Sequence, residues 1–247
     1  MPRRSLSKIQ GKRDLSHYFI PMEIEYSEST YDPETAALAQ PGDGADKVLR
    51  TSYASLSGLT PDELQEKLFG RVAPLEFEIG SGKGLFISEA AERNPDRNFL
   101  GVEIAYRYAL ISATRLAKKD AQNGVMMNAD AAKVLREIIP LNSIADAHIY
   151  FPDPWWKKAH RKRRIVRPDV VSMIEARLER GGRLHFWTDV KEYFDSGVEI
   201  IKLSTSLVGP FNIPERPAAD DMDFLTHFER RTRLGDKPVY RSYFVKK

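Results

Sequence analysis

The chain has no cysteine among its 247 residues, which excludes both a disulfide framework and a thiolate metal site. It has only five histidines, and none of them shows the spacing of a helical metal-binding pair, so we expect no metal. No apolar run approaches the roughly 18 residues of a membrane-spanning helix, and no secretory apolar segment follows Met1. We therefore expect a cytoplasmic protein that has no membrane partner.

The small net charge of +3 conceals two basic segments. Residues 152–167 carry seven cations against Asp153, and residues 1–20 carry five cations against Asp14, which leaves the remainder of the chain at −7. Concentrated positive charge favours a polyanionic partner such as a nucleic acid. The alternatives for residues 152–167 are a solvated face or a nuclear localisation signal.

From residue 75 onward the pattern of apolar residues is regular. Short strands are predicted at 75–79, 98–102, 125–127, 146–151 and 183–188, and they alternate with helices at 84–93, 105–121, 131–138, 168–179 and 191–205. This alternation predicts an α/β fold: a Rossmann-like, doubly wound, mostly parallel sheet with helices on both faces. A short helix at 61–68 and a weaker strand at 239–245 complete the pattern.

The first 50 residues lack this regularity. They are basic at the start and rich in Ser, Pro, Gly and Asp later, which predicts an irregular, partly disordered N-terminal extension. We therefore divide the chain into the extension, residues 1–50, and one α/β domain, residues 51–247. In parallel sheets ligands bind beyond the carboxyl ends of the strands, so the residues at these ends are candidate site residues.

The first predicted strand runs into the sequence Glu78-Ile-Gly80-Ser-Gly82-Lys-Gly84. Glycines at 80, 82 and 84 let the backbone turn tightly and approach a ligand closely. The spacing fails the GxGxxG pattern of dinucleotide sites. The acid Glu78 suits a cationic ligand instead, such as the sulfonium-bearing amino acid end of S-adenosylmethionine.

Acids also follow the next two predicted strands. Glu103 lies 19 residues beyond Gly84, where a carboxylate can accept hydrogen bonds from both hydroxyls of a ribose. Asp130 follows the third strand and can accept from an adenine amino group. Either acid could instead be an ordinary helix N-cap, but the ordered set on successive strand ends favours an S-adenosylmethionine site.

The fourth predicted strand ends at Pro152-Asp153-Pro154, followed by Trp155 and Trp156. The seven cations come next, within residues 157–167, a segment that we call the basic run. An isolated carboxylate beside flat aromatic rings and cations suits the binding of a base together with phosphates. Trp155 and Trp156 could stack on a base or pack in the core. Trp187 lies inside the fifth predicted strand and is expected in the core.

The chain from about residue 75 to its end resembles the tRNA (guanine-N7-)-methyltransferase family. The matching motifs are EIGSGKG at 78–84, LGVEI at 100–104, NADA at 128–131, FPDPWWKKAHRKRRIV at 151–166, TDV at 188–190 and THFERR at 226–231. The resemblance implies a class I S-adenosylmethionine-dependent methyltransferase that modifies N7 of guanosine 46 in the variable loop of tRNA and releases S-adenosylhomocysteine. The family includes monomers, homodimers and complexes with a second subunit.

The resemblance also assigns roles to residues. Asp153 is the implied catalytic residue, and the donor site comprises Glu78, Gly80, Gly82, Gly84, Glu103, Asp130 and Asp153. The implied tRNA contacts are Lys157, Ala159, His160, Arg161, Lys162, Arg163, Arg164, Asp189, Thr226, His227, Phe228 and Glu229.

Two other functions fit parts of the pattern. The DPxW sequence also resembles the Asp-Pro-Pro-aromatic loop of amino-methylating enzymes, so another RNA or DNA base methyltransferase is an alternative. A non-catalytic RNA-binding protein on the same fold is the other, although acids at all the donor-site strand ends argue against it.

Overall fold

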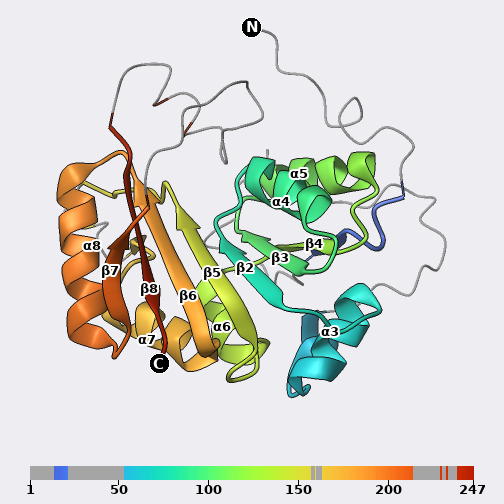
Figure 1. The fold of residues 1–247 in the computed structure, drawn as a ribbon. Coiled ribbons are helices and arrows are strands. Elements are labelled where there is room, and N and C mark those ends of the chain that lie inside the picture. Colours follow the sequence, from blue (N-terminus) through green and yellow to red (C-terminus); the bar gives the residue numbers. More distant parts are fainter. Residues whose placement is uncertain are drawn as a thin grey trace, which may run out of the picture.

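The computed structural model describes residues 14–21, 53–156, 159, 163–213, 229, 232 and 238–247. Within these residues, eight strands form one sheet with the order β1-β4-β3-β2-β5-β6-β8-β7 (Figure 1). The strands are β1 (Phe19–Pro21), β2 (Leu75–Ile79), β3 (Asn98–Glu103), β4 (Gly124–Asn128), β5 (Ile144–Tyr150), β6 (Leu178–Thr188), β7 (Val208–Asn212) and β8 (Tyr240–Val245). Strands β1 to β6 are parallel, whereas β8 runs antiparallel to both β6 and β7.

Helices cover both faces of the sheet. They are the short 3-10 helix η2 (Tyr53–Leu56) and the α-helices α3 (Pro61–Phe69), α4 (Leu85–Arg93), α5 (Tyr106–Lys119), α6 (Ala131–Glu137), α7 (Pro168–Arg177) and α8 (Lys191–Ser204). Helices α4 and α5 lie on one face, and α6, α7 and α8 lie on the other (Figure 1). This arrangement confirms the predicted doubly wound, mostly parallel α/β fold.

Alternation along β2 shows how the sequence places the core. Leu75, Phe77 and Ile79 point into the larger apolar cluster, which α3, α6, α7 and α8 also line. Glu76 and Glu78 fall on the opposite face because successive side chains of a strand alternate. The carboxylate nearest the end of the strand, Glu78, is therefore turned toward the α4 side.

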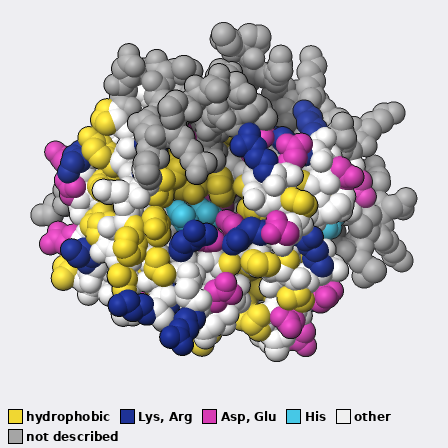
Figure 2. Space-filling model, viewed as in Figure 1, with side chains coloured by type: hydrophobic (Ala, Val, Ile, Leu, Met, Phe, Trp, Pro, Cys, Tyr) yellow, Lys and Arg dark blue, Asp and Glu magenta, His cyan; other side chains and the backbone are white. Residues whose placement is uncertain are grey.

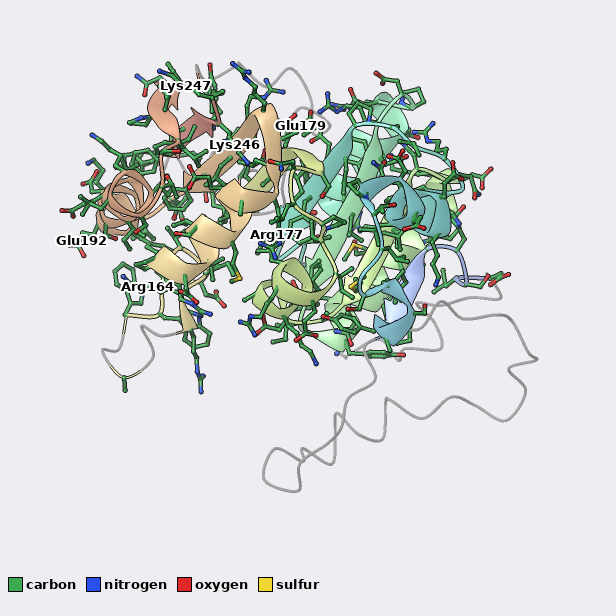
Figure 3. All side chains as sticks on the ribbon, turned by 90° about the horizontal axis from the view of Figure 1, so that it is seen from below. Arg164, Arg177, Glu179, Glu192, Lys246 and Lys247 are labelled. Carbon is green, nitrogen blue, oxygen red and sulfur yellow. The ribbon has the colours of Figure 1, made fainter. Side chains whose placement is uncertain are left out.

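Helix α7 ends earlier than predicted and β6 begins earlier. The pairing of β5 with β6 shifts from Ile144 opposite Leu178 to Asp146 opposite Arg183, so the residues between them loop out of the ladder. Gly181 takes a φ of 83° in this loop, and its amide donates to Lys246 O at 2.8 Å. Figure 3 shows Glu179 and Lys246 near each other at this corner. Two consecutive glycines therefore mark a bulge inside the strand rather than the end of the helix.

Strand β1 lies within the region that the sequence predicted to be irregular. It pairs in parallel with β4, Pro21 opposite Asn128, and the amide of Met126 donates to Tyr18 O at 2.9 Å. Tyr18 and Ile20 are buried. Part of the extension thus completes the edge of the sheet, while residues 1–13 and 22–50 lie outside the described residues. The boundary at residue 50 stays a prediction.

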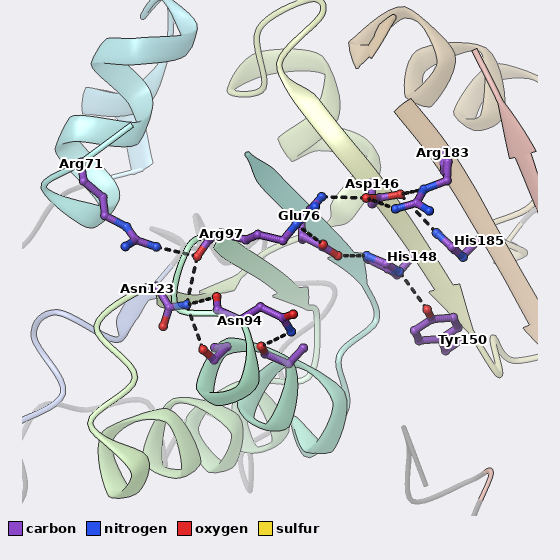
Figure 4. Close-up of polar contacts among 12 residues, drawn as sticks. Arg71, Glu76, Asn94, Arg97, Asn123, Asp146, His148, Tyr150, Arg183 and His185 are labelled. Atoms are coloured by element: carbon purple, nitrogen blue, oxygen red, sulfur yellow. Dashed lines mark hydrogen bonds and ion pairs between the residues drawn. The ribbon is translucent and has the colours of Figure 1, made fainter. Parts of the chain in front are cut away.

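A polar network crosses the α4 side of the sheet and joins β2, β5 and β6 (Figure 4). Asp146 accepts from Arg97 Nη2 at 2.8 Å and from Arg183 Nη2 at 2.9 Å, while His148 Nε2 contacts Glu76 Oε2 at 2.5 Å. Burial alone would raise the pKa of Asp146, but hydrogen bonds from His185 and Arg183 outweigh it and lower the pKa. Figure 2 shows histidine side chains at the centre of this face. The network ties together three of the strands whose carboxyl ends line the candidate site.

Candidate active site

The strand order reverses at β2, which pairs with β3 on one side and β5 on the other. In open parallel sheets this switch point is where ligands bind. The loop after β2 begins there, and Gly80 and Gly82 adopt φ values of 76° and 55°, which favour glycine. A Cβ atom at either position would meet nothing within 4 Å. These two glycines therefore border open space that a ligand can occupy.

Gly84 has a different function from the other two glycines. Its φ is 71°, and a Cβ atom there would lie only 1.9 Å from Ser112 Oγ of α5. The structure thus places Gly84, a predicted donor-site residue, where it allows α4 and α5 to pack closely. Its contribution to a ligand site is to set where α4 begins.

Glu78 is a buried carboxylate, and its Oε2 atom has no hydrogen-bond partner among the residues that the structure describes. Burial raises the pKa of Glu78 to about 8; the Ser81 side chain lowers this pKa by a smaller amount, and the negative charge of Glu103 adds to the rise. A buried carboxylate is costly unless a cation pairs with it. The site therefore fits a ligand that brings positive charge to Glu78.

Glu103 ends β3 and binds the backbone on two sides. Its Oε2 atom accepts from the Gly82 amide at 2.9 Å, and its Oε1 atom accepts from the Ala105 amide at 2.8 Å. The side-chain amide of Asn128 donates to the carbonyls of Glu103 and Ile104 at 2.9 and 3.0 Å, which links the ends of β3 and β4. The glycine loop, Glu103 and the end of β4 are thus one hydrogen-bonded unit.

Asp130 is the N-cap of α6 and lies exposed after β4. Its Oδ1 atom accepts from the amides of Ala132 at 2.7 Å and Lys133 at 3.1 Å. The helix-cap interpretation of the sequence is therefore confirmed for this residue. Asp130 also lies at a strand end next to that of Glu103. The predicted contact of Asp130 with an adenine stays a proposal.

The loop after β5 holds Asp153 in an exposed turn between two residues with positive φ. Phe151 has a φ of 48° and Trp155 a φ of 40°, which are unfavourable for residues with large side chains. The amide of Phe151 donates to Trp187 O at 2.8 Å, which fixes the start of the turn to β6. Asp153 is thereby presented to solvent at the carboxyl edge of the sheet.

The three tryptophans occupy three different environments. Trp187 is 6% exposed, which confirms its predicted place in the core, and it packs with Phe86, Tyr150 and Phe151. Trp156 is 58% exposed. Trp155 is half-buried, and the guanidinium carbon of Arg163 lies 5.1 Å from its ring centroid. Trp156 is thus the tryptophan whose ring is most available to a base.

The predicted tRNA contacts are only partly within the described residues. Asp189 and Ala159 are exposed, and Asp189 follows β6 at the same edge as Asp153. Glu229 is 3% exposed and forms an ion pair with Arg241 at 3.0 Å, and the Arg241 guanidinium lies 5.2 Å from the Trp187 ring. Seven other predicted contacts lie outside the described residues: Lys157, His160, Arg161, Lys162, Thr226, His227 and Phe228.

Two residues of this region had no signal in the sequence. Arg241 lies in β8 and holds Glu229, and Tyr193 lies in α8 with the Arg164 guanidinium 4.8 Å from its ring. Each lies within a regular helix or strand with no motif around it. Only the fold brings Arg241 to Glu229 and Tyr193 to Arg164. Among the described residues, no group of His, Asp and Glu side chains is placed to hold a metal ion, and no helix there has the length and apolarity to cross a membrane.

The chain is similar to solved methyltransferases in its fold. It matches the 16S rRNA methyltransferase KamB with a TM-score of 0.54 and 17% identity, covering 75% of this chain and 94% of that one. It matches a mutant 16S rRNA (adenine(1408)-N(1))-methyltransferase of Catenulisporales acidiphilia, solved with its cosubstrate SAM, with a TM-score of 0.52 and 18% identity, covering 76% and 92% of the two chains. These likenesses concern the fold.

Sequence comparison gives closer relatives. A family model described as "Putative methyltransferase" matches residues 72–242. A tRNA (guanine-N(7)-)-methyltransferase of Rhodopirellula baltica is 44% identical over 199 residues, covering 76% of this chain and 73% of the relative. The protein of the same name from Alcanivorax borkumensis is 36% identical over 185 residues, covering 74% and 76%.

The sheet order, the glycine loop and the acids at the strand ends define a class I S-adenosylmethionine-dependent methyltransferase. Within that class, the chain belongs to the tRNA (guanine-N7-)-methyltransferase family. The family resemblance carried by the motifs is thus confirmed.

Proposed function

We propose that the protein transfers a methyl group from S-adenosylmethionine to N7 of guanosine 46 in the variable loop of tRNA and releases S-adenosylhomocysteine. The observation that carries this proposal is the position of Asp153. It lies in an exposed turn at the carboxyl edge of the sheet, directly after β5. Strand β5 is the neighbour of β2, which carries Glu78 and leads into the glycine loop. The basic run follows this turn in the sequence. In this proposal, a site for a cationic donor and a surface for a polyanionic substrate share one edge of the sheet.

The residues suit this reaction without a general base. Guanine N7 already has a lone pair in the ring plane, so the nucleophile needs no proton removed, and positioning can supply most of the catalysis, about 7–11 kcal/mol. The bound donor would supply the methyl group. Glu78 fits its positive charge, and Glu103 fits its ribose. Asp153 would stabilise the positive charge that the guanine ring gains.

The direct test uses an unmodified tRNA transcript and labelled donor, followed by mapping of the modified nucleotide. We expect label at N7 of guanosine 46, and no label on a transcript in which that guanosine is replaced by adenosine. Label on another base would instead support the alternative of a different base methyltransferase. An unlabelled tRNA that still binds the protein would support a non-catalytic RNA-binding protein.

Glu103→Ala should weaken donor binding by about tenfold to a hundredfold. The substitution removes the proposed ribose acceptor and also leaves the Gly82 and Ala105 amides without their acceptor, and each lost hydrogen bond to a charged group is worth about 1.5–3 kcal/mol. Calorimetry with S-adenosylhomocysteine measures the effect. Glu92→Ala, an exposed acid on α4, is the control. An unchanged affinity in Glu103→Ala would remove Glu103 from the donor site.

The basic run should determine the affinity for tRNA and leave donor affinity nearly unchanged. Cations that meet phosphates release counterions, so log K falls with log salt by roughly 0.7–0.9 per contact. Neutralising Arg161, Lys162 and Arg163 together should therefore flatten the salt dependence by about two to three units. Binding measured from low to moderate salt gives the slope. If the cations of the basic run are only solvated by water, the plots of log K against log salt for wild type and the variant will coincide.

A further inference from the structure

Two adjacent arginines of the basic run have opposite environments. Arg163 is exposed, and its guanidinium lies over Trp155. Arg164 is half-buried; its Nε atom donates to Pro154 O at 2.7 Å, and its guanidinium carbon lies 4.8 Å from the Tyr193 ring centroid. Of the two, Arg163 is exposed to solvent, whereas Arg164 is held by contacts within the protein.

Arg164 binds the turn that carries Asp153. This turn is strained at both ends, because Phe151 and Trp155 have φ values of 48° and 40°. Strained residues of this kind persist only where their surroundings hold them. The amide of Phe151, bonded to Trp187 O, holds the first end. The Arg164 bond to Pro154 O holds the second end, directly before Trp155.

The anchor of Arg164 is itself rigid. Tyr193 is 1% exposed, and its ring contacts Phe186 of β6 edge-on, with the centroids 5.9 Å apart. Figure 3 labels Arg164 near α8, the helix that carries Tyr193 and Glu192. The guanidinium plane thus links the Asp153 turn to the core of the sheet through one side chain.

We propose that Arg164 is a positioning residue that fixes Asp153 through Pro154, and that it does not contact a phosphate of the substrate. This inference rests on the proposed function. It revises the role that the family resemblance implies for Arg164 and leaves that of Arg163 in place. Lysine cannot replace this arginine, because the site uses the flat face of the guanidinium and a directed Nε donor.

The experiment compares Arg164→Lys, Arg164→Met and the matched control Arg163→Met. For each protein we measure kcat at saturating tRNA and donor, the salt dependence of tRNA binding, and the midpoint of thermal unfolding. Both Arg164 variants should lose about tenfold to a hundredfold in kcat, because a small misplacement of a catalytic group can cost about that much. Their tRNA affinity and salt slope should match wild type. Arg163→Met should instead lose affinity and flatten the slope by roughly 0.7–0.9.

The charge-conserving variant decides between the two roles. Normal kcat in Arg164→Lys, together with weaker tRNA binding and a flatter slope in Arg164→Met, would overturn the proposal in favour of a phosphate contact. Normal kcat in both variants would also overturn it. If Arg164→Met does not fold, Arg164→Lys alone decides. Failure of the proposed function is a separate result, because wild type itself would then leave tRNA unmethylated.

Discussion

Asp153→Ala is expected to lower kcat for tRNA methylation by about a hundredfold to a thousandfold, the range seen when one group that stabilises developing charge is removed. The fold should survive, because Asp153 is exposed and lies in a turn whose backbone is held by the Phe151 amide and by Arg164. The thermal midpoint of the variant should therefore stay close to that of wild type. Single-turnover methylation with saturating donor measures the chemical step.

Two further variants make this result specific. Asp153→Asn keeps the shape and the hydrogen-bonding oxygen but removes the charge, so a loss equal to that of alanine would assign the effect to charge. Asp195→Ala removes an exposed acid of α8 that pairs with Lys191, and it should leave kcat unchanged. Near wild-type turnover in Asp153→Ala would remove Asp153 from the catalytic role.

Glu78→Gln is expected to change how stability depends on pH. The folded protein holds a proton on Glu78 up to its pKa of about 8, whereas the unfolded chain loses that proton near the ordinary value of 4.5. The native state therefore binds more protons between these values, and the free energy of unfolding falls as the pH rises through them. With about 1.4 kcal/mol per pKa unit, the loss attributable to Glu78 has an upper limit of roughly 4–5 kcal/mol.

Glutamine cannot ionise, so the variant should lack this fall. Denaturant unfolding at pH 5.5 and pH 8.5 gives the change in the free energy of unfolding between the two pH values for each protein. This change is the quantity to compare, because the buried amide of the variant lowers stability by the same amount at both pH values. Glu66→Gln, an exposed acid on α3, should show the wild-type pH dependence. Parallel curves for wild type and Glu78→Gln would show that Glu78 does not titrate in this interval.

Donor binding gives an independent readout of the same residue. A cationic ligand favours ionised Glu78, so binding releases its proton and affinity rises with pH up to about 8. The shift in thermal midpoint caused by S-adenosylhomocysteine, whose amino group is cationic, should grow from pH 6 to pH 8.5 in wild type. It should be smaller and flatter in Glu78→Gln.

Strand and helix positions in the domain were largely predictable because their signals are local. Thr60-Pro61-Asp62-Glu63 predicts the start of α3, and the structure shows a full capping box there. The alternation of Leu75, Phe77 and Ile79 likewise predicts both β2 and its buried face. Such patterns are set by neighbouring residues, so the sequence contains them directly.

Features that depend on distant residues were not predictable. Strand β1 has only three residues, and its partner strand begins more than 100 residues later. Arg164 shows the same limit within the site. In the sequence it is one of several cations in a run, and its bond to Pro154 and its place on Tyr193 exist only after the loop has folded against α8.

The position of β1 also has a consequence for synthesis of the chain. Phe19 to Pro21 pair with Met126 to Asn128, and His17 Nε2 contacts Gln122 O at 2.7 Å. The ribosome makes the amino-terminal strand first, yet its partner emerges only after most of the donor site has been translated. Folding of this domain during translation therefore cannot proceed strictly from the amino terminus. Strand β1 can pair only after β4 has been synthesised, and the edge of the sheet is complete only at that point.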